Sequence, residues 1–227
     1  MLRILHTSDL HGSRTNYKAL LAVAEPFDVW LDTGDFFPTY GRRSNTGDQI
    51  DPAQELRHQT SWGFHKDIGR RLVAWLHGRP CISTPGNHDF ISLVTLLRRF
   101  GGEAHAIRPE GITVAGHTWA GFREIPWISG EWPGEVHDFS DLVDRTFEAS
   151  PNPHFLVTHA PPSGMLDTEP GYEYGIPGLL NALNYRPNRV RAHFFGHAHK
   201  CGGGVRKEGG ILFANGAKNI RVHTLNQ

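Results

Sequence analysis

The chain has 227 residues, of which 38% are hydrophobic, and its 23 basic and 23 acidic side chains give a formal net charge of +0. This length and apolar content suffice for one hydrophobic core, so we expect a single domain spanning residues 1–227. The balanced charge argues against a broad binding surface for extended nucleic acid or an anionic membrane. No apolar run approaches the roughly 18 residues of a membrane span and no leader-like segment opens the chain, so we expect a cytoplasmic protein.

The first part of the chain alternates between apolar strand-like segments and helical segments. Strands are predicted at residues 2–5 and 29–31, and a helix is predicted over Asn16–Ala24, where apolar residues recur at helical spacing. A long helix is predicted over Pro52–His77, because Asp51 can cap its first turn and an apolar stripe runs along it.

The rest of the chain continues this alternation, with more strands toward its end. The predicted elements are, in chain order, a strand at 81–83, a helix at 91–100, a hairpin at 112–122, a helix at 138–148, strands at 155–157 and 193–195, and a closing antiparallel meander that includes 211–213 and 221–223. An α/β fold, with two β-sheets packed face to face and helices outside, fits this order.

Five polar motifs each follow one of the strand-like segments directly. They are Asp9-Leu10-His11, Gly34-Asp35, Gly86-Asn87-His88-Asp89, His159, and Gly196-His197-Ala198-His199. Each motif alone is more typical of a turn or a structural hydrogen bond than of a metal site. Their joint occurrence after successive strands instead predicts that the polar groups gather at one edge of the sheets.

The residue types in these motifs indicate transition-metal chemistry. Carboxylate oxygens combined with imidazole nitrogens suit manganese, iron, zinc, cobalt or nickel better than calcium or magnesium. Two carboxylates, four imidazoles and one amide are too many donors for one tetrahedral ion. Two cations about 3.5–4 Å apart need a shared anionic bridge, and Asp35 is the natural bridge.

The ordered pattern of D-x-H, G-D, G-N-H-D, H and G-H-x-H resembles the calcineurin-like metallophosphoesterase superfamily over residues 9–199. Within it, the chain looks most similar to small, single-domain members of the cyclic-nucleotide phosphodiesterase type and to metallophosphoesterase-domain-containing proteins. The resemblance implies a four-layer αββα sandwich of two mixed β-sheets flanked by helices.

The resemblance also implies a role for each motif residue. One divalent ion, expected to be manganese, would be held by Asp9, His11, Asp35 and His199, and the second by Asp35, Asn87, His159 and His197. His88 would be a non-ligand imidazole beside the substrate phosphoryl group, and Asp89 would orient it.

The implied function is dinuclear-metal-dependent hydrolysis of phosphoester bonds. A phosphodiesterase acting on small esters, including nucleotides, through attack of a metal-activated hydroxide on phosphorus is the favoured form. The alternatives are a phosphomonoesterase or protein-phosphatase-like enzyme, and a nuclease of the Mre11/SbcD type, which the opening segment at residues 4–9 resembles. A non-catalytic interaction module is least favoured, because all seven predicted ligands and His88 are present.

Three loops are expected to set specificity, at residues 36–46, 123–137 and 163–175. They carry side chains that could stack on a nucleobase or meet a phosphate: Arg42, Arg123, Trp127, Tyr172 and Tyr174 are the leading candidates, and Trp132 is a further aromatic candidate. The alternative is that the rings pack these loops against the sheets. Of the two cysteines, Cys81 is predicted to be a buried core thiol, and Cys201 lies in a loop beside His199.

Overall fold

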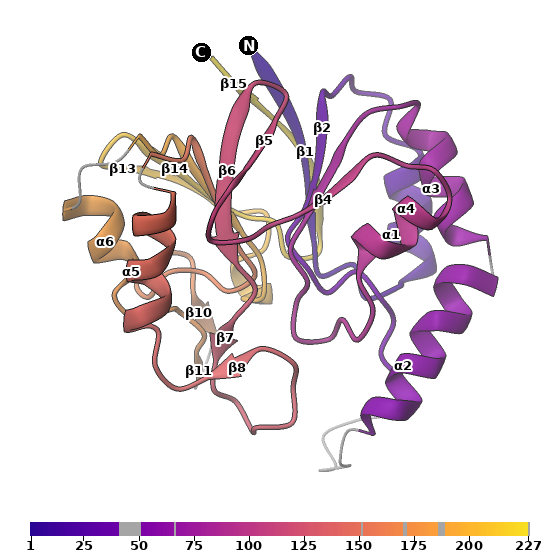
Figure 1. Cartoon of the computed structure of the whole chain (residues 1–227), viewed down its shortest axis with the longest axis horizontal. Coiled ribbons are helices and arrows are strands. Elements are labelled where there is room, and N and C mark those ends of the chain that lie inside the picture. Colours follow the sequence, from indigo (N-terminus) through magenta and orange to yellow (C-terminus); the bar gives the residue numbers. More distant parts are fainter. Residues whose placement is uncertain (41–50, 66, 151, 170–171, 186–188, 227) are drawn as a thin grey trace.

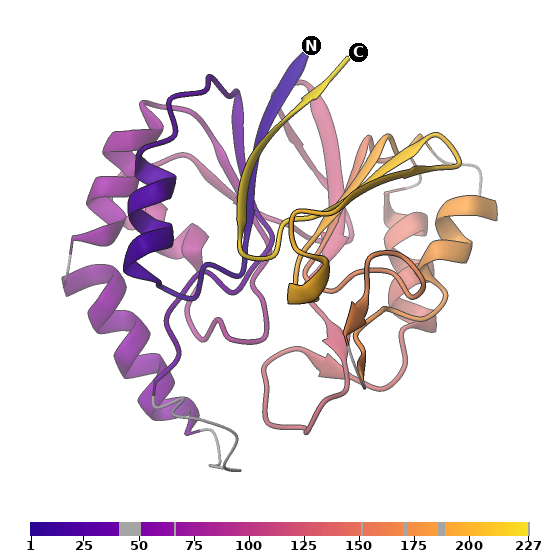
Figure 2. The same ribbon diagram turned by 180° about the vertical axis from the view of Figure 1, so that it is seen from behind.

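The computed structural model of the chain describes residues 1–40, 51–65, 67–150, 152–169, 172–185 and 189–226. Two β-sheets face each other at its centre, and each is covered on its outer side by helices (Figure 1). Seen from behind, the same four layers follow one another across the molecule (Figure 2). The predicted αββα sandwich of two mixed sheets is therefore confirmed.

The first sheet has five strands in the order β15-β1-β2-β3-β4. These are β1 (Leu2–Ser8), β2 (Val29–Asp32), β3 (Cys81–Ser83), β4 (Ala104–Ala106) and β15 (Asn219–Leu225). Strands β1 to β4 run parallel to one another, and β15 pairs antiparallel with β1. All residues of β2 and β3 are buried, as expected for central strands that have layers on both faces.

The second sheet has six strands in the order β13-β14-β12-β9-β6-β5. These are β5 (Ile112–Val114), β6 (His117–Phe122), β9 (Phe155–Thr158), β12 (Ala192–Phe195), β13 (Val205–Glu208) and β14 (Ile211–Asn215). The four inner strands run parallel, whereas β5 and β13 are antiparallel edges. The predicted hairpin over residues 112–122 is confirmed as β5 and β6.

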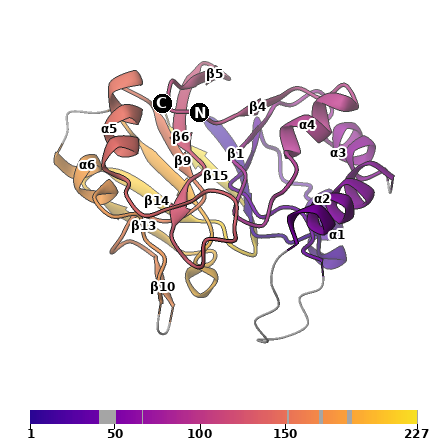
Figure 3. The ribbon, with the colours of Figure 1, turned by 60° about the horizontal axis from the view of Figure 1, so that its bottom comes forward.

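Helices of the N-terminal part cover the first sheet, and later helices cover the second (Figure 3). The first group is α1 (Arg14–Leu21), α2 (Pro52–Thr60), α3 (Ile68–Leu76) and α4 (Leu93–Arg99), and the second is α5 (Ser140–Ala149) and α6 (Leu179–Tyr185). Asp51 caps α2 by accepting hydrogen bonds from the amides of Ala53 and Gln54, as predicted. Among the described residues, no helix is both long and apolar enough to cross a bilayer.

The prediction of one continuous helix over Pro52–His77 was wrong. The helical segment breaks after α2 into a π-helical turn at Ser61–His65, and Asp67 adopts a left-handed conformation with φ of 55° before α3 begins. Trp62 in this turn packs edge-on against Tyr17, Phe36 and Phe37. Tertiary packing of a large aromatic side chain thus overrides the helical periodicity of the sequence.

The predicted closing meander was also wrong in its last strand. β13 and β14 form an antiparallel hairpin, but β15 crosses to the other sheet and pairs with β1 in register from Leu2 with Leu225 to Ser8 with Asn219. Alternation of apolar residues predicts a strand but does not specify its partner. The sequence did not predict β4, α6 or the small strands β7 (Ile125–Pro126), β8 (Glu135–Val136), β10 (Thr168–Glu169) and β11 (Tyr172–Glu173).

Side chains of both sheets interlock between the two layers. Ile4, Val29 and Leu31 of the first sheet belong to one buried cluster with Trp119 and Phe194 of the second. Burial of such side chains contributes roughly 1.5–3 kcal/mol each. This shared core fixes the two sheets against each other and thereby fixes the relative positions of the loops at their ends.

Candidate metal centre

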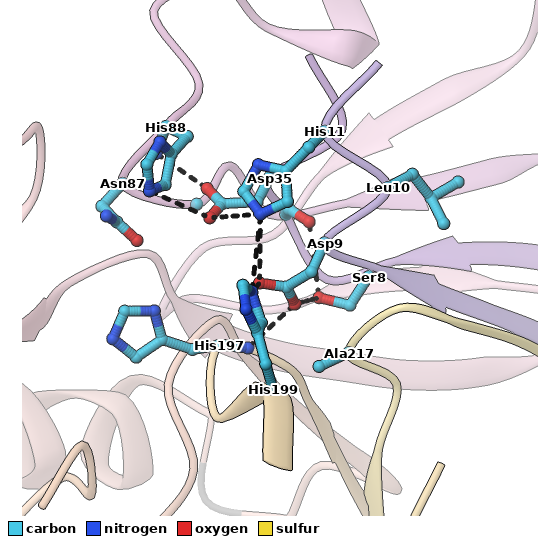
Figure 4. Close-up of polar contacts among 12 residues, drawn as sticks. Ser8, Asp9, Leu10, His11, Asp35, Asn87, His88, His197, His199 and Ala217 are labelled. Carbon is cyan, nitrogen blue, oxygen red and sulfur yellow. Dashed lines mark hydrogen bonds and ion pairs between the residues drawn. The ribbon is translucent and has the colours of Figure 1, made fainter. Parts of the chain in front are cut away.

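The polar motifs of the sequence meet where parallel strands of both sheets end (Figure 4). Asp9 directly follows β1, and Asp35 lies three residues beyond the end of β2. His159 directly follows β9 of the second sheet, and His197 lies two residues beyond β12. Potential ligands that follow four strands of the two sheets therefore lie together, as the sequence predicted.

The first group of potential ligands consists of Asp9, His11 and His199. Nε2 of His199 lies 2.9 Å from Oδ1 of Asp9, and Nε2 of His11 lies 3.9 Å from the same oxygen. The two imidazole nitrogens are 3.5 Å apart. Donor atoms from the three residues all lie within 4.8 Å of one another, which is compact enough for one cation.

The second group consists of Asp35, His159 and His197, again with donor atoms within 4.8 Å of one another. Nδ1 of His159 donates a hydrogen bond of 2.7 Å to the carbonyl of Thr33, which directs Nε2 into the site. That Nε2 lies 3.5 Å from Oδ2 of Asp35 and 3.2 Å from Oδ1 of Asn87. Asn87 is thus positioned to join this group.

His197 gives an independent test of whether these residues fit a metal. Its Nε2 is buried and has no hydrogen-bond partner among the described residues. A buried nitrogen without a partner costs free energy unless it binds something. A cation beside Asp35 and His159 would satisfy it, so the residues present fit a metal site.

Asp35 lies between the two groups. Its Oδ2 is 3.5 Å from His159 Nε2, 3.8 Å from His11 Nε2 and 3.9 Å from His88 Nε2. Its other oxygen accepts a hydrogen bond of 2.7 Å from the backbone amide of His88, which fixes the carboxylate. This placement is the one that a bridging ligand requires.

The charges at the site couple the acidic and imidazole groups. Burial acts to raise the pKa of Asp35, but the charges of His88 and His159 hold it well below its usual value. Burial likewise opposes protonation of His159, yet the carboxylate of Asp35 raises its pKa to about 10. Burial and the charge of His159 lower the pKa of His197 to about 3. Asp35 therefore attracts positive charge, and the imidazole of His197 beside it stays neutral. The neutral form of histidine is the one that binds a metal ion.

The backbone at the site is held in an uncommon conformation. Asp9, His11, Asp35 and His197 all have φ between 47° and 66°, a left-handed conformation that costs about 1–3 kcal/mol for residues other than glycine. A side chain at Gly86 would collide with the carboxylate and the amide of Asp35. Strain concentrated at four predicted ligands is consistent with a functional constraint on their positions.

His88 also lies within the cluster. It forms a third compact group with His11 and Asp35, and its ring is 4.9 Å from that of His11. Its Nδ1 lies 3.0 Å from the hydroxyl of Thr39. Proximity alone therefore does not separate a ligand role from the predicted catalytic role.

Asp89 does not orient His88 as the sequence predicted. Its carboxylate accepts hydrogen bonds from the backbone amides of Asp35 at 2.7 Å, Gly86 at 2.9 Å and Phe37 at 3.1 Å. Asp89 thus ties the loop of Asp35 to the loop of His88. Burial and the charge of Asp35 raise its pKa to about 7.

Sequence reasoning missed two supporting residues. Thr39 lies at Nδ1 of His88, as described above. Gln59 on α2 donates to the backbone carbonyl of His88 at 2.6 Å and accepts from the amide of Phe90 at 2.8 Å. In the sequence Gln59 does not differ from the other polar residues of α2, so no sequence signal identified it.

The side chains at the mouth of the site differ in exposure. His11 and His199 retain 24% and 33% of their side-chain exposure, whereas Asp35 retains 2%. The cluster is therefore approached from the side of His11 and His199, with Asp35 and His159 at its floor.

The predicted specificity residues fall in different places. The ring of Tyr174 lies 4.8 Å from that of His197, edge-on, so Tyr174 borders the site. Trp127 is 48% exposed and stacks on His137. Arg123 lines a neighbouring cavity together with residues such as Pro85, and the motif residues do not line that cavity. Arg42 lies outside the described residues, as does the side chain of Tyr172, whose backbone forms part of β11.

Trp132, the further aromatic candidate of these loops, lies beside His88. The ring of Trp132 is 4.2 Å from that of His88 and inclined to it by 45°. Of the cysteines, Cys81 is fully buried, as predicted, and the thiol of Cys201 lies 3.5 Å from the carbonyl of Thr168.

Comparison with known proteins agrees with the motif pattern. The chain is 31% identical over 111 residues to metallophosphoesterase domain-containing protein 1 of Homo sapiens, a match covering 48% of this chain and 33% of that protein. It is 26% identical over 140 residues to a UPF0046 protein of Caenorhabditis elegans, covering 60% and 42% of the two chains. The matches thus span less than half the length of these relatives.

Among solved structures, sulfate thiohydrolase SoxB of Thermus thermophilus matches 97% of this chain and 55% of its own, with a TM-score of 0.39 and 13% identity. The profile of the calcineurin-like phosphoesterase family matches residues 2–201, which include all five polar motifs. The chain therefore belongs to the calcineurin-like phosphoesterase family.

Proposed function

We propose that this chain is a dinuclear-metal-dependent phosphoesterase that acts on small phosphodiesters. The observation that carries the proposal is the position of Asp35 between two groups of metal-binding side chains. A single structural metal would need neither a second group of ligands nor a carboxylate shared between them. Family membership supports the same chemistry.

In this proposal the first ion is held by Asp9, His11, Asp35 and His199, and the second by Asp35, Asn87, His159 and His197. Manganese is the proposed ion, because the donors mix imidazole nitrogen with hard oxygen. Two bound cations would polarise the phosphoryl oxygens and lower the pKa of a water molecule toward neutrality.

The remaining steps belong to residues of the chain. In this proposal His88 donates a proton or a hydrogen bond to the oxygen on which negative charge develops as the ester bond breaks. Thr39 holds Nδ1 of its ring, and the backbone carbonyl of His88 is held by Gln59. These contacts fix the direction of Nε2 toward the carboxylate of Asp35.

The proposed substrate is a small ester with an aromatic leaving part, such as a nucleotide. Trp132 beside His88 and Tyr174 beside His197 provide aromatic surfaces at two points of the site's border. Stacking of a base on such a ring contributes about 1–3 kcal/mol. Trp127 stacks on His137 rather than on a motif residue, and Arg42 and the side chain of Tyr172 lie outside the described residues.

Metal analysis combined with a substrate panel tests the proposal. The purified protein should contain two divalent ions per chain. With added manganese it should hydrolyse an aryl phosphodiester and cyclic or linear dinucleotides faster than aryl phosphomonoesters, phosphopeptides or duplex DNA. The control is His105→Ala, because His105 is hydrogen-bonded to Glu103 and lies away from the site. One tightly bound ion, or preference for the monoester, the phosphopeptide or the duplex, would contradict the proposal.

A further inference from the structure

A separate cavity of about 290 Å³ lies behind the loop that carries Asn87 and His88. Its walls come from the ends of β3, β4 and β6, the start of α4, and α5. Pro85 and Ser92 line it and bracket the loop on either side, but none of the predicted metal ligands contributes to it. The cavity is therefore adjacent to the metal centre and distinct from it.

Three arginines line this cavity, and they are Arg108, Arg123 and Arg145. Glu124 is the one acidic residue lining it, so the formal charge of its walls is positive. The Nε and Nη2 atoms of Arg123 are buried, and no described residue forms a hydrogen bond with them. A guanidinium removed from water without a partner is costly, because its donors lose their hydration.

Other arginines in the protein show how such groups are normally satisfied. Arg3 pairs with Asp28 through its Nε and Nη2 atoms, and Arg79 and Arg98 donate to backbone carbonyls. Within the described residues, no carboxylate or carbonyl accepts a hydrogen bond from Nε or Nη2 of Arg123. The charge of this guanidinium is therefore not offset by an internal acceptor at Nε or Nη2, so it can draw an anion toward the cavity.

The chemistry of the walls defines that ligand. Guanidinium groups from three segments of the wall favour a phosphate or a carboxylate, and the forked donors of a guanidinium suit the oxygens of a phosphate best. Ser83 and Ser92 add hydroxyl groups, whereas Leu93, Phe122 and Leu142 supply apolar walls. A volume near the lower end of the range for ligand pockets limits the ligand to a few carbon atoms beyond its phosphate.

We propose that this cavity is a second anion-binding site that takes a small organic phosphate. The site does not depend on metal, since its lining contains no metal-binding group of the first site. Because Pro85 and Ser92 belong to its walls, a ligand there contacts both ends of the segment that positions Asn87 and His88. Binding at this cavity is a claim independent of the proposed catalytic function.

Calorimetric titration with ethylphosphonate tests the proposal, because its carbon–phosphorus bond resists hydrolysis. The metal-loaded full chain should show binding that persists in Asp35→Ala, where the metal centre is disrupted. Arg123→Gln and Arg145→Gln should each weaken this persistent binding at least tenfold. Arg145 is exposed on α5, so its replacement leaves the core intact even if Arg123→Gln lowers stability.

Arg99→Gln is the matched control, because Arg99 is an exposed arginine at the far end of α4 that does not line the cavity. It should bind ethylphosphonate as the unaltered chain does. Loss of all binding in Asp35→Ala, or equal affinities in Arg145→Gln and Arg99→Gln, would overturn the proposal. Either result would leave the proposed phosphoesterase activity untouched, because this experiment measures no turnover.

Discussion

The ring of Trp132 lies 4.2 Å from the ring of His88, inclined to it by 45°. Trp132 belongs to the segment between β7 and β8, whereas His88 follows β3, so the contact joins a loop of the second half of the chain to the motif of the first. The indole therefore limits the movement of the imidazole and presents an aromatic surface next to it.

This contact makes Trp132 and Tyr174 the residues to test for base stacking. Trp132→Ala or Tyr174→Ala should reduce kcat/KM for a dinucleotide by a factor that corresponds to about 1–3 kcal/mol, the contribution of one stacked base. A small aryl phosphodiester should be affected much less, because it does not reach beyond the metals. Trp127→Ala serves as the control, since Trp127 stacks on His137 and not on a site residue. Equal losses on both substrates would assign the two rings to packing.

His88 should behave differently from the metal ligands. His88→Ala is expected to retain the metal content of the unaltered protein while turnover falls by roughly 10²–10⁴, the range for a positioned acid–base group. His197→Ala, by contrast, should lose metal, because His197 contributes to the Asp35 and His159 group. Metal content measured alongside turnover distinguishes the two. If His88→Ala loses metal to the same extent as His197→Ala, then His88 is a ligand.

His193 predicts a pH dependence of stability. Burial lowers the pKa of this histidine on β12 to about 3, and its Nε2 lies 2.8 Å from the hydroxyl of Thr158. In the unfolded chain its pKa returns to about 6.5. At a pH between these two pKa values, His193 therefore takes up a proton when the chain unfolds. The free energy of unfolding should therefore decrease as the pH falls below 6.5, by up to about 2 kcal/mol at pH 5.

Urea titrations at several pH values measure this dependence. His193→Gln should show a shallower decrease in the free energy of unfolding between pH 6.5 and 5, whatever its stability at neutral pH. His105→Gln, at a partly exposed position, should retain the slope of the unaltered protein. Identical slopes for His193→Gln and His105→Gln would show that His193 is not held neutral by burial.

Most of the candidate site could be predicted from the sequence, because its residues directly follow the ends of strands. Asp9 and Asp35 are carried to one edge by the parallel pairing of β1 and β2, which the alternation of strands and helices already indicated, and His159 follows β9 of the facing sheet. The break at Ser61–His65 could not be predicted in this way. It results from the packing of Trp62 against residues distant in sequence, which local periodicity does not report.

The contacts around His88 show the same limit. Adjacency in sequence favoured Asp89 as its partner, yet the carboxylate of Asp89 accepts backbone amides across the loop and Thr39 reaches the ring instead. Neighbouring side chains on an irregular loop do not point in the same direction, so sequence spacing does not predict their contacts. Trp132 and Gln59 likewise approach from segments whose path the sequence does not specify.

The metal content of Asp35→Ala tests the central claim most directly. Asp35 lies between both groups of ligands, and an alanine there leaves no anion to offset the repulsion between two cations about 3.5–4 Å apart. We expect two divalent ions per chain in the unaltered protein and at most one in Asp35→Ala, with hydrolysis of an aryl phosphodiester abolished. Two ions retained in Asp35→Ala together with near-normal hydrolysis would contradict a dinuclear centre bridged by Asp35.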